Sequence, residues 1–157
     1  PVLGDLLAGL HPRRFPRHLR VTRRVGHVTE AFGVIALHHL QQGRVVIFAA
    51  GTGNPFFTTD TTAALRAIET ECQVLAKATQ VDGVYSEDPM KNPNATRYET
   101  VSYDEVIGKN LRVMDTAAFA LARDNAMPII VYALDDAAGL AGVLAGTTRS
   151  TRVGNPI

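Results

Sequence analysis

The stretch RVVIFAAGTGNPFFTTDTTAALRAIETECQVLAKA, residues 44–78, contains the pattern that decides the fold. Its first eight residues, RVVIFAAG, contain a continuous apolar run that is rich in β-branched side chains and ends at a glycine, which is typical of a strand buried on both faces. TAALRAIETECQ then places Leu65, Ile68 and Cys72 on one face of a helix, and QVLAKA resumes a strand. The stretch therefore predicts one βαβ unit with a central parallel strand.

The alternation continues along the chain. VDGVYSEDPMKNPNATRYETVS predicts a loop-rich excursion with a hairpin. SYDEVIGKN begins with a capping box of Ser102 and Glu105 and predicts a short helix, and MDTAAFALARDNA predicts another. MPIIVYAL predicts a buried strand, DDAAGLAGVLAG a helix capped by Asp135 or Asp136 and stopped by Gly146, and TRSTRVG an edge strand. We expect an α/β fold, a three-layer α/β/α sandwich with a mainly parallel sheet.

The first part of the chain has a different composition. Residues 1–50 contain seven arginines, no lysine, two acidic residues and all five histidines, and six of the arginines lie in 13–24. VTEAFGVIALHHLQQG predicts a helix closed by Gly43. We therefore divide the chain into an Arg/His-rich segment, 1–43, and an α/β domain, 44–157. A nucleic-acid-binding arm is an alternative for the arginine run, but no recognisable nucleic-acid-binding motif supports it.

The composition also indicates a cellular setting. The chain has a single cysteine, Cys72, and it has no apolar run that approaches the roughly 18 residues of a membrane span. A protein with so little cysteine is typical of a reducing compartment. We expect a cytoplasmic protein that does not cross a membrane.

The loop after the first predicted strand has the chemistry of a nucleotide site. Gly51 and Gly53 let the backbone approach a ligand closely, and Asn54 offers both a donor and an acceptor. Residues 58–60 lie where the next helix begins, so free backbone N–H groups and threonine hydroxyls would face a phosphate there. The plainer alternative is that Thr59 or Asp60 only caps the helix and that the two phenylalanines belong to the core.

Five motifs in one order carry a family resemblance. GTGNPFFTTDT, KATQVDGVYSEDPMKNPNA, SYDEV, VMDTAAFALARDNAMPI and AGTTRSTRVG resemble the carboxyl-terminal portion of the bacterial-type UMP kinases, which belong to the amino acid kinase family. The resemblance covers residues 43–154. It implies an amino acid kinase-like nucleotide-binding domain over 44–157 and a cytoplasmic transferase of pyrimidine nucleotide biosynthesis, which moves the γ-phosphoryl of ATP to UMP with Mg²⁺ and forms UDP and ADP.

The resemblance also implies roles for individual residues. The UMP-binding residues would be Thr52, Gly53, Asn54, Pro55, Phe56, Phe57, Thr58 and Thr59. The ATP-binding residues would be Thr79, Tyr85 and Asp88. Asp60 and Asp115 would be catalytic acidic residues near the reacting phosphates, where a carboxylate can orient Mg²⁺ or a phosphate-binding group. Each has a plainer alternative: strand packing for Tyr85, a turn for Asp88 and a helix cap for Asp115.

The sequence departs from the family pattern where phosphate is held. Neither a lysine loop of the KLSGE type nor a GGGN loop is present, and the only lysines are Lys77, Lys91 and Lys109. Losing that cation should cost several kcal/mol of transition-state stabilisation, a rate loss of about 10³ or more. We therefore expect impaired catalysis by these 157 residues. A non-catalytic nucleotide-binding or subunit-interaction module is the alternative.

Smaller departures concern the loop and the assembly. Ala50 replaces a glycine of the family and would crowd the loop if its φ is positive, and Gln80 replaces a basic residue near ATP. The resemblance implies a homo-oligomer, a hexamer in the family. In the family an arginine cluster contributes both to the subunit contacts and to regulation by GTP. Here that cluster is replaced by residues 33–35, Gly-Val-Ile, which weakens both expectations. The composition before residue 28 also fits a frameshifted or truncated reading frame.

Overall fold

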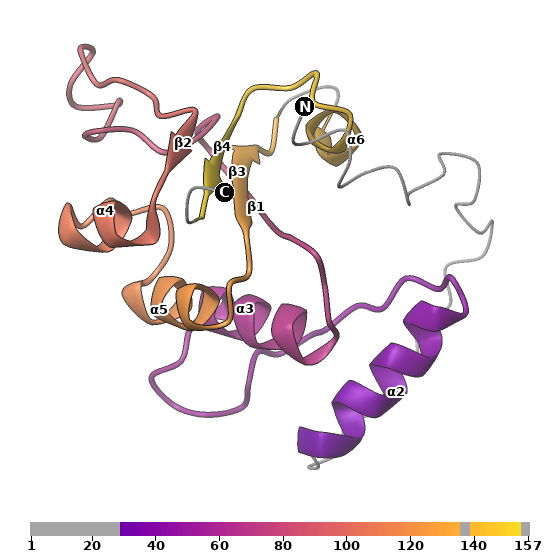
Figure 1. Cartoon of the computed structure of the whole chain (residues 1–157). Helices are drawn as coiled ribbons and strands as arrows, with labels where there is room; N and C mark the ends of the chain where they lie inside the picture. Colours follow the sequence, from indigo (N-terminus) through magenta and orange to yellow (C-terminus); the bar gives the residue numbers. More distant parts are fainter. Residues whose placement is uncertain (1–28, 136–138, 155–157) are drawn as a thin grey trace.

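The structure is a computed structural model that describes residues 29–135 and 139–154, with side chains from residue 33 onward. Its strands are β1 (Leu75–Thr79), β2 (Thr100–Val101), β3 (Ile129–Ala133) and β4 (Ser150–Val153). Its helices are α2 (Thr29–Gln41), α3 (Thr59–Glu69), α4 (Tyr103–Gly108), α5 (Thr116–Asp124) and α6 (Gly139–Leu144). Figure 1 shows α3, α4 and α5 on one side of the sheet, α6 on the other, and α2 apart from both. The arginine run at 13–24 and the predicted cap Asp136 lie outside the described residues.

The four strands form one mixed sheet in the order β1-β3-β4-β2. β1 pairs in parallel with β3 and β2 pairs in parallel with β4, whereas β3 and β4 are antiparallel. The mainly parallel sheet and its helical layers confirm the predicted fold class. The prediction that TRSTRVG forms an edge strand is wrong, because β4 lies between β3 and β2 and buries Thr151 and Val153 completely.

Successive β3 side chains point to opposite faces of the sheet, and helices cover both faces. Ile129 and Val131 join the main core under α3, α4 and α5, whereas Ile130 and Tyr132 pack with Val143 of α6. This continuous apolar strand is what MPIIVYAL predicts. The three layers therefore follow directly from the burial of one central strand.

Small side chains set the spacing of the helical layer that carries the site. α3 and α5 bury Ala64, Ala67, Ala118 and Ala122 in the same core. Alanine lets two helix backbones approach closely, and Phe119 of α5 fills the volume beneath them. The close packing brings the first turn of α3 beside the start of α5.

The predicted strand RVVIFAAG is the principal error about the fold. Residues 44–49 are not in a strand, and the side chains of Val45, Ile47 and Phe48 are 52%, 59% and 39% exposed. Phe48 lies against Arg66 of α3, 5.9 Å from its guanidinium carbon, and not in a sheet. A buried strand needs paired neighbours, and among the described strands none is paired with this segment, although β1 is at one end of the sheet order. An apolar run alone therefore does not establish a central strand.

Ala50 has the positive φ that makes a side chain unfavourable. Its φ is 69°, in the left-handed region, where a Cβ costs about 1–2 kcal/mol. We predict that Ala50→Gly raises the free energy of unfolding by about 0.5–1 kcal/mol, because the relieved strain exceeds the added flexibility of the unfolded chain. Urea unfolding checks this. Ala49→Gly, at a position without positive φ, is the matched control and should lower stability by a similar amount. Equal effects of the two variants would contradict the strain at residue 50.

The excursion between β1 and β2 packs tightly against β4. Residues Tyr85 and Arg97 form an isolated antiparallel bridge, which is the remnant of the predicted hairpin. Gly83 lies so close to β4 that a Cβ on it would be 2.3 Å from the hydroxyl oxygen of Thr151. That hydroxyl accepts a hydrogen bond from the Val84 N–H at 2.9 Å and donates one to the Tyr98 carbonyl. The glycine therefore permits both ends of the excursion to be held by one threonine.

Candidate functional site

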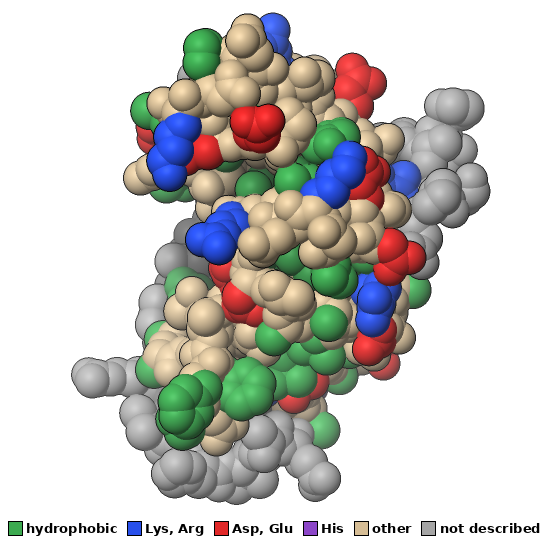
Figure 2. Space-filling model, turned by 90° about the vertical axis from the view of Figure 1, so that its left-hand side faces the viewer, with side chains coloured by type: hydrophobic (Ala, Val, Ile, Leu, Met, Phe, Trp, Pro, Cys, Tyr) green, Lys and Arg blue, Asp and Glu red, His purple; other side chains and the backbone are tan. Residues whose placement is uncertain are grey.

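The loop predicted to bind UMP, residues 52–59, lies on the surface; we call it the acceptor loop. Phe56 and Phe57 are 102% and 55% exposed, so the alternative that they belong to the core is wrong. Gly51 and Gly53 have φ values of 68° and 76°, as a close-turning glycine loop requires, and the Asn54 N–H donates to the Thr52 hydroxyl at 3.1 Å. In Figure 2, exposed hydrophobic side chains gather in the lower left part of the described surface. A ligand would therefore find two unburied aromatic rings beside a polar turn.

The start of α3 is capped by Thr58, and not by Thr59 or Asp60. The Thr58 hydroxyl accepts the backbone N–H of Asp60 at 3.1 Å and that of Thr61 at 3.3 Å, and the Thr62 N–H donates to the Thr58 carbonyl at 3.1 Å. The Asp60 N–H therefore donates within the chain and is not free for a phosphate, which corrects that part of the prediction. The cap satisfies the first N–H groups of the helix that it contacts, those of Asp60 and Thr61.

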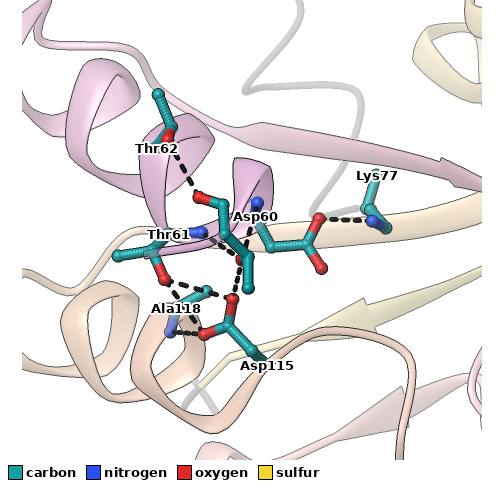
Figure 3. A network of polar contacts seen from close by, with 7 residues as sticks. Asp60, Thr61, Thr62, Lys77, Asp115 and Ala118 are labelled. Carbon is teal, nitrogen blue, oxygen red and sulfur yellow. Dashed lines mark hydrogen bonds and ion pairs between the residues drawn. The ribbon is translucent and has the colours of Figure 1, made fainter. Parts of the chain in front are cut away.

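Asp115 joins the end of the predicted UMP-binding loop to the start of α5 (Figure 3). Its carboxylate caps α5 by accepting the Ala118 N–H at 2.7 Å, and it also accepts hydrogen bonds from the hydroxyls of Thr58 and Thr61. The plainer alternative of a helix cap is thus correct but incomplete. One carboxylate holds the starts of α3 and α5 together.

Two opposing effects act on the pKa of Asp115. Burial alone would raise the pKa of this carboxyl, but the hydrogen bonds from Thr58, Ala118 and Thr61 outweigh burial and hold it below the ordinary value of 3.8. The group is therefore ionised at neutral pH. An anion with four hydrogen-bond contacts is better suited to fixing the loop than to exchanging a proton.

Asp60 has a partner that the motif pattern does not reveal. Its Oδ1 is in an ion pair with Nζ of Lys77, which projects from β1 (Figure 3). Lys77 was not among the predicted site residues. The sequence does contain a signal for Lys77. This lysine lies in the middle of a predicted strand, two positions before Thr79, and so its side chain is on the same face as that predicted site residue.

The predicted ATP-binding residues have local partners. Thr79 ends β1, and its carbonyl accepts the Leu134 N–H at 2.8 Å. The Tyr85 hydroxyl donates to Asp82 at 2.6 Å; this hydrogen bond and then burial raise the Tyr85 pKa. Asp88 accepts the Met90 N–H at 3.0 Å, which is the turn that its plainer alternative describes.

The structure brings only part of the predicted site together. Asp60, Thr58 and Asp115 form one cluster with Lys77, whereas the excursion that contains Tyr85 and Asp88 lies at the other end of the view from the acceptor loop (Figure 1). Residues 44–49, which precede the acceptor loop, are outside the sheet. The loop therefore does not begin at the end of a sheet strand, as the prediction required. A surface hollow is lined by none of these residues; its lining is Cys72, Gln73, Asn125, Ala126, Met127 and Pro128.

The described residues do not form a complete metal cage. No group of three or more His, Cys, Asp or Glu side chains able to hold an ion is found among them. Mg²⁺ in phosphoryl transfer needs only one or two carboxylates in addition to phosphate oxygens and water. Asp60, which uses Oδ1 for Lys77, could supply one such carboxylate.

No described helix is long and apolar enough to span a membrane.

Comparison with known proteins shows the family. The sequence profile of the amino acid kinase family matches residues 7–133. The chain belongs to the amino acid kinase family. Within this family it is 59% identical over 118 residues to the uridylate kinase of Agrobacterium fabrum, a match that covers 75% of this chain and 49% of that protein. The chain spans about half the length of the curated relatives that it matches.

Solved structures of UMP kinases share the fold of this amino acid kinase chain. The crystal structure of UMP kinase from Ureaplasma parvum has a TM-score of 0.74 and 37% identity, and the match covers 83% of this chain and 55% of that one. UMP kinase from Bacillus anthracis gives a TM-score of 0.75 and 37% identity, with coverage of 80% and 52%. The sheet and its helices thus share the fold of about half of each of these UMP kinases.

Proposed function

We propose that this chain is part of a UMP kinase and that it contributes the UMP-binding loop and the acidic residues of phosphoryl transfer. The observation that carries the proposal is the 59% identity to a uridylate kinase over 118 residues. The match spans 118 of the 157 residues, so wherever it begins it must include residues 40–118. Every predicted site residue lies within this range. The reaction is transfer of the γ-phosphoryl of ATP to UMP, which forms UDP and ADP.

The residues divide this work between binding and positioning. The loop Thr52–Thr59 would hold UMP, with its glycines close to the nucleotide and Asn54 available for hydrogen bonds. Asp115 would fix this loop, since it is the anchor of Thr58 and Thr61. Asp60 would face the phosphates and share Mg²⁺ with them, and Thr79, Tyr85 and Asp88 would hold ATP. Phosphoryl transfer depends mainly on such positioning and on charge neutralisation.

The test combines binding with turnover on one sample of the folded chain. Calorimetric titrations with UMP and with Mg·ATP measure binding, and a coupled assay measures UDP formation. We expect binding of UMP together with slow turnover, because these 157 residues contain no lysine in a glycine-rich loop. A sample that is folded by circular dichroism and binds neither nucleotide would refute the proposal. Turnover at the rate of an intact UMP kinase would refute the expectation of impaired catalysis.

A further inference from the structure

Lys77 differs from the other two lysines of the chain in where its charge lies. Lys91 pairs with Asp88 and Lys109 with Glu105, each three or four residues away on the surface, and their side chains are 84% and 55% exposed. Lys77 is only 27% exposed, and its partner Asp60, 17 residues earlier and in another element, is 20% exposed. The pair is therefore a tertiary contact between a strand and a helix, and not a solvated surface pair.

The surroundings of Lys77 explain why such a pair is retained. Leu75 and Val131, its neighbours on this face of the sheet, pack in or against the main core, so the lysine stem leaves an apolar layer at the first turn of α3. Withdrawing an ammonium and a carboxylate from water is costly, and an apolar pair would serve packing equally well. A functional reason for the charges is therefore worth testing.

We propose that Lys77 recognises phosphate in the nucleotide site. This inference rests on the proposed UMP kinase function. Lys77 lies between the two predicted sets of residues, since it contacts Asp60 next to the UMP loop and precedes Thr79 of the ATP set on the same face of β1. An unpaired Asp60 would repel a phosphate. The ammonium cancels that charge and has three N–H donors, of which one faces Asp60 and the other two would donate to phosphate oxygens.

The test compares UMP with uridine, which differs only by the phosphate. Lys77→Met keeps the length of the side chain and removes its charge, and we expect it to weaken UMP binding by roughly tenfold to a hundredfold in calorimetric titration. Binding of uridine should be unchanged. Lys109→Met, which makes the same change of net charge at a surface pair outside the site, is the matched control and should leave both affinities unchanged. Lys77→Arg should restore part of the UMP affinity.

The possible outcomes separate this inference from the function on which it rests. If the wild-type chain binds UMP and Lys77→Met binds it equally well, the role of Lys77 is refuted and the UMP site stands. If Lys77→Met loses uridine and UMP alike, the lysine acts only through the fold, which also refutes the inference. If Lys77→Met does not fold, the double variant Asp60→Asn/Lys77→Met replaces it, because it leaves no unpaired carboxylate. This double variant should still bind uridine and should lose its affinity for UMP. Wild-type chain that binds neither ligand refutes both proposals.

Discussion

Replacing Asp115 with alanine is expected to lower the free energy of unfolding by about 2–3 kcal/mol. The variant removes the cap of α5 and leaves the Ala118 N–H and the hydroxyl of Thr61 without their acceptor. Thr61 is buried, so its hydroxyl is not easily satisfied by water. The start of α3 would also lose its attachment to α5 through Thr58. Urea unfolding followed by circular dichroism measures the change.

Asp124 provides the control within the same helix. It ends α5, its side chain is 65% exposed, and it pairs with Arg123 on the surface. Asp124→Ala should change stability by less than about 0.5 kcal/mol, because surface ion pairs contribute little. Similar losses for both variants would show that Asp115 has no special part in joining the two helices.

Acidification should remove the contribution of the Asp115 charge. Because its folded pKa is lowered from 3.8, the unfolded chain binds the proton more readily than the folded one. The stabilisation is complete above pH 3.8 and is lost as the pH falls through the folded pKa. Asp115→Asn retains an oxygen for the cap but no charge. Its stability deficit relative to wild type should be constant between pH 6 and 8 and smaller at pH 3; a deficit that grows on acidification would contradict the lowered pKa.

Gly83→Ala is expected to cost roughly 3 kcal/mol of stability. The new Cβ would lie 2.3 Å from the Thr151 hydroxyl oxygen, far inside contact distance, and Thr151 is completely buried in the central strand β4. Moving this threonine would break its hydrogen bonds with Val84 and Tyr98. Thermal and urea unfolding should show the loss. Gly108→Ala is the control, since a Cβ there has no atom within 4 Å and α4 should tolerate or favour alanine.

A double-mutant cycle identifies the clash as the cause. Thr151→Ala removes the hydroxyl and should itself be destabilising, since it orphans the Val84 N–H. In that background Gly83→Ala should cost much less than in the wild type, because the remaining close atoms belong to the flexible Arg97 side chain. Additive costs would place the strain elsewhere than between residues 83 and 151.

Those parts of the fold that depend on local pattern could be predicted from the sequence. α3, α5, β1 and β3 were expected because each carries its own period of apolar residues, and the helix caps Ser102 and Asp115 are local as well. The position of β4 could not be predicted in this way. A four-residue strand shows which residues alternate but not which strands lie on either side of it.

The contacts of the candidate site were less predictable because they join distant segments. Asp60 and Asp115 were expected near the reacting phosphates from the family resemblance, and their assignment as catalytic residues stays a prediction. Lys77 is 17 residues from Asp60, and Thr58 and Thr61 are 57 and 54 residues from Asp115; these partners become neighbours only when β1, α3 and α5 pack together. The strand expected at residues 44–51 is wrong for the same reason, since burial requires neighbours that its own sequence does not specify.

That segment has a consequence for the behaviour of the protein in solution. Val45, Ile47 and Phe48 belong to an exposed apolar run outside the sheet, and the end strand β1 has a neighbour on only one side among the described strands. An apolar run without a partner and a sheet edge without a partner offer complementary hydrogen bonds, within one molecule or between two. If the run of one molecule pairs with the sheet edge of another, the apparent stability of the chain should increase with its concentration, and a melting temperature measured at one dilution would not describe the protein at another.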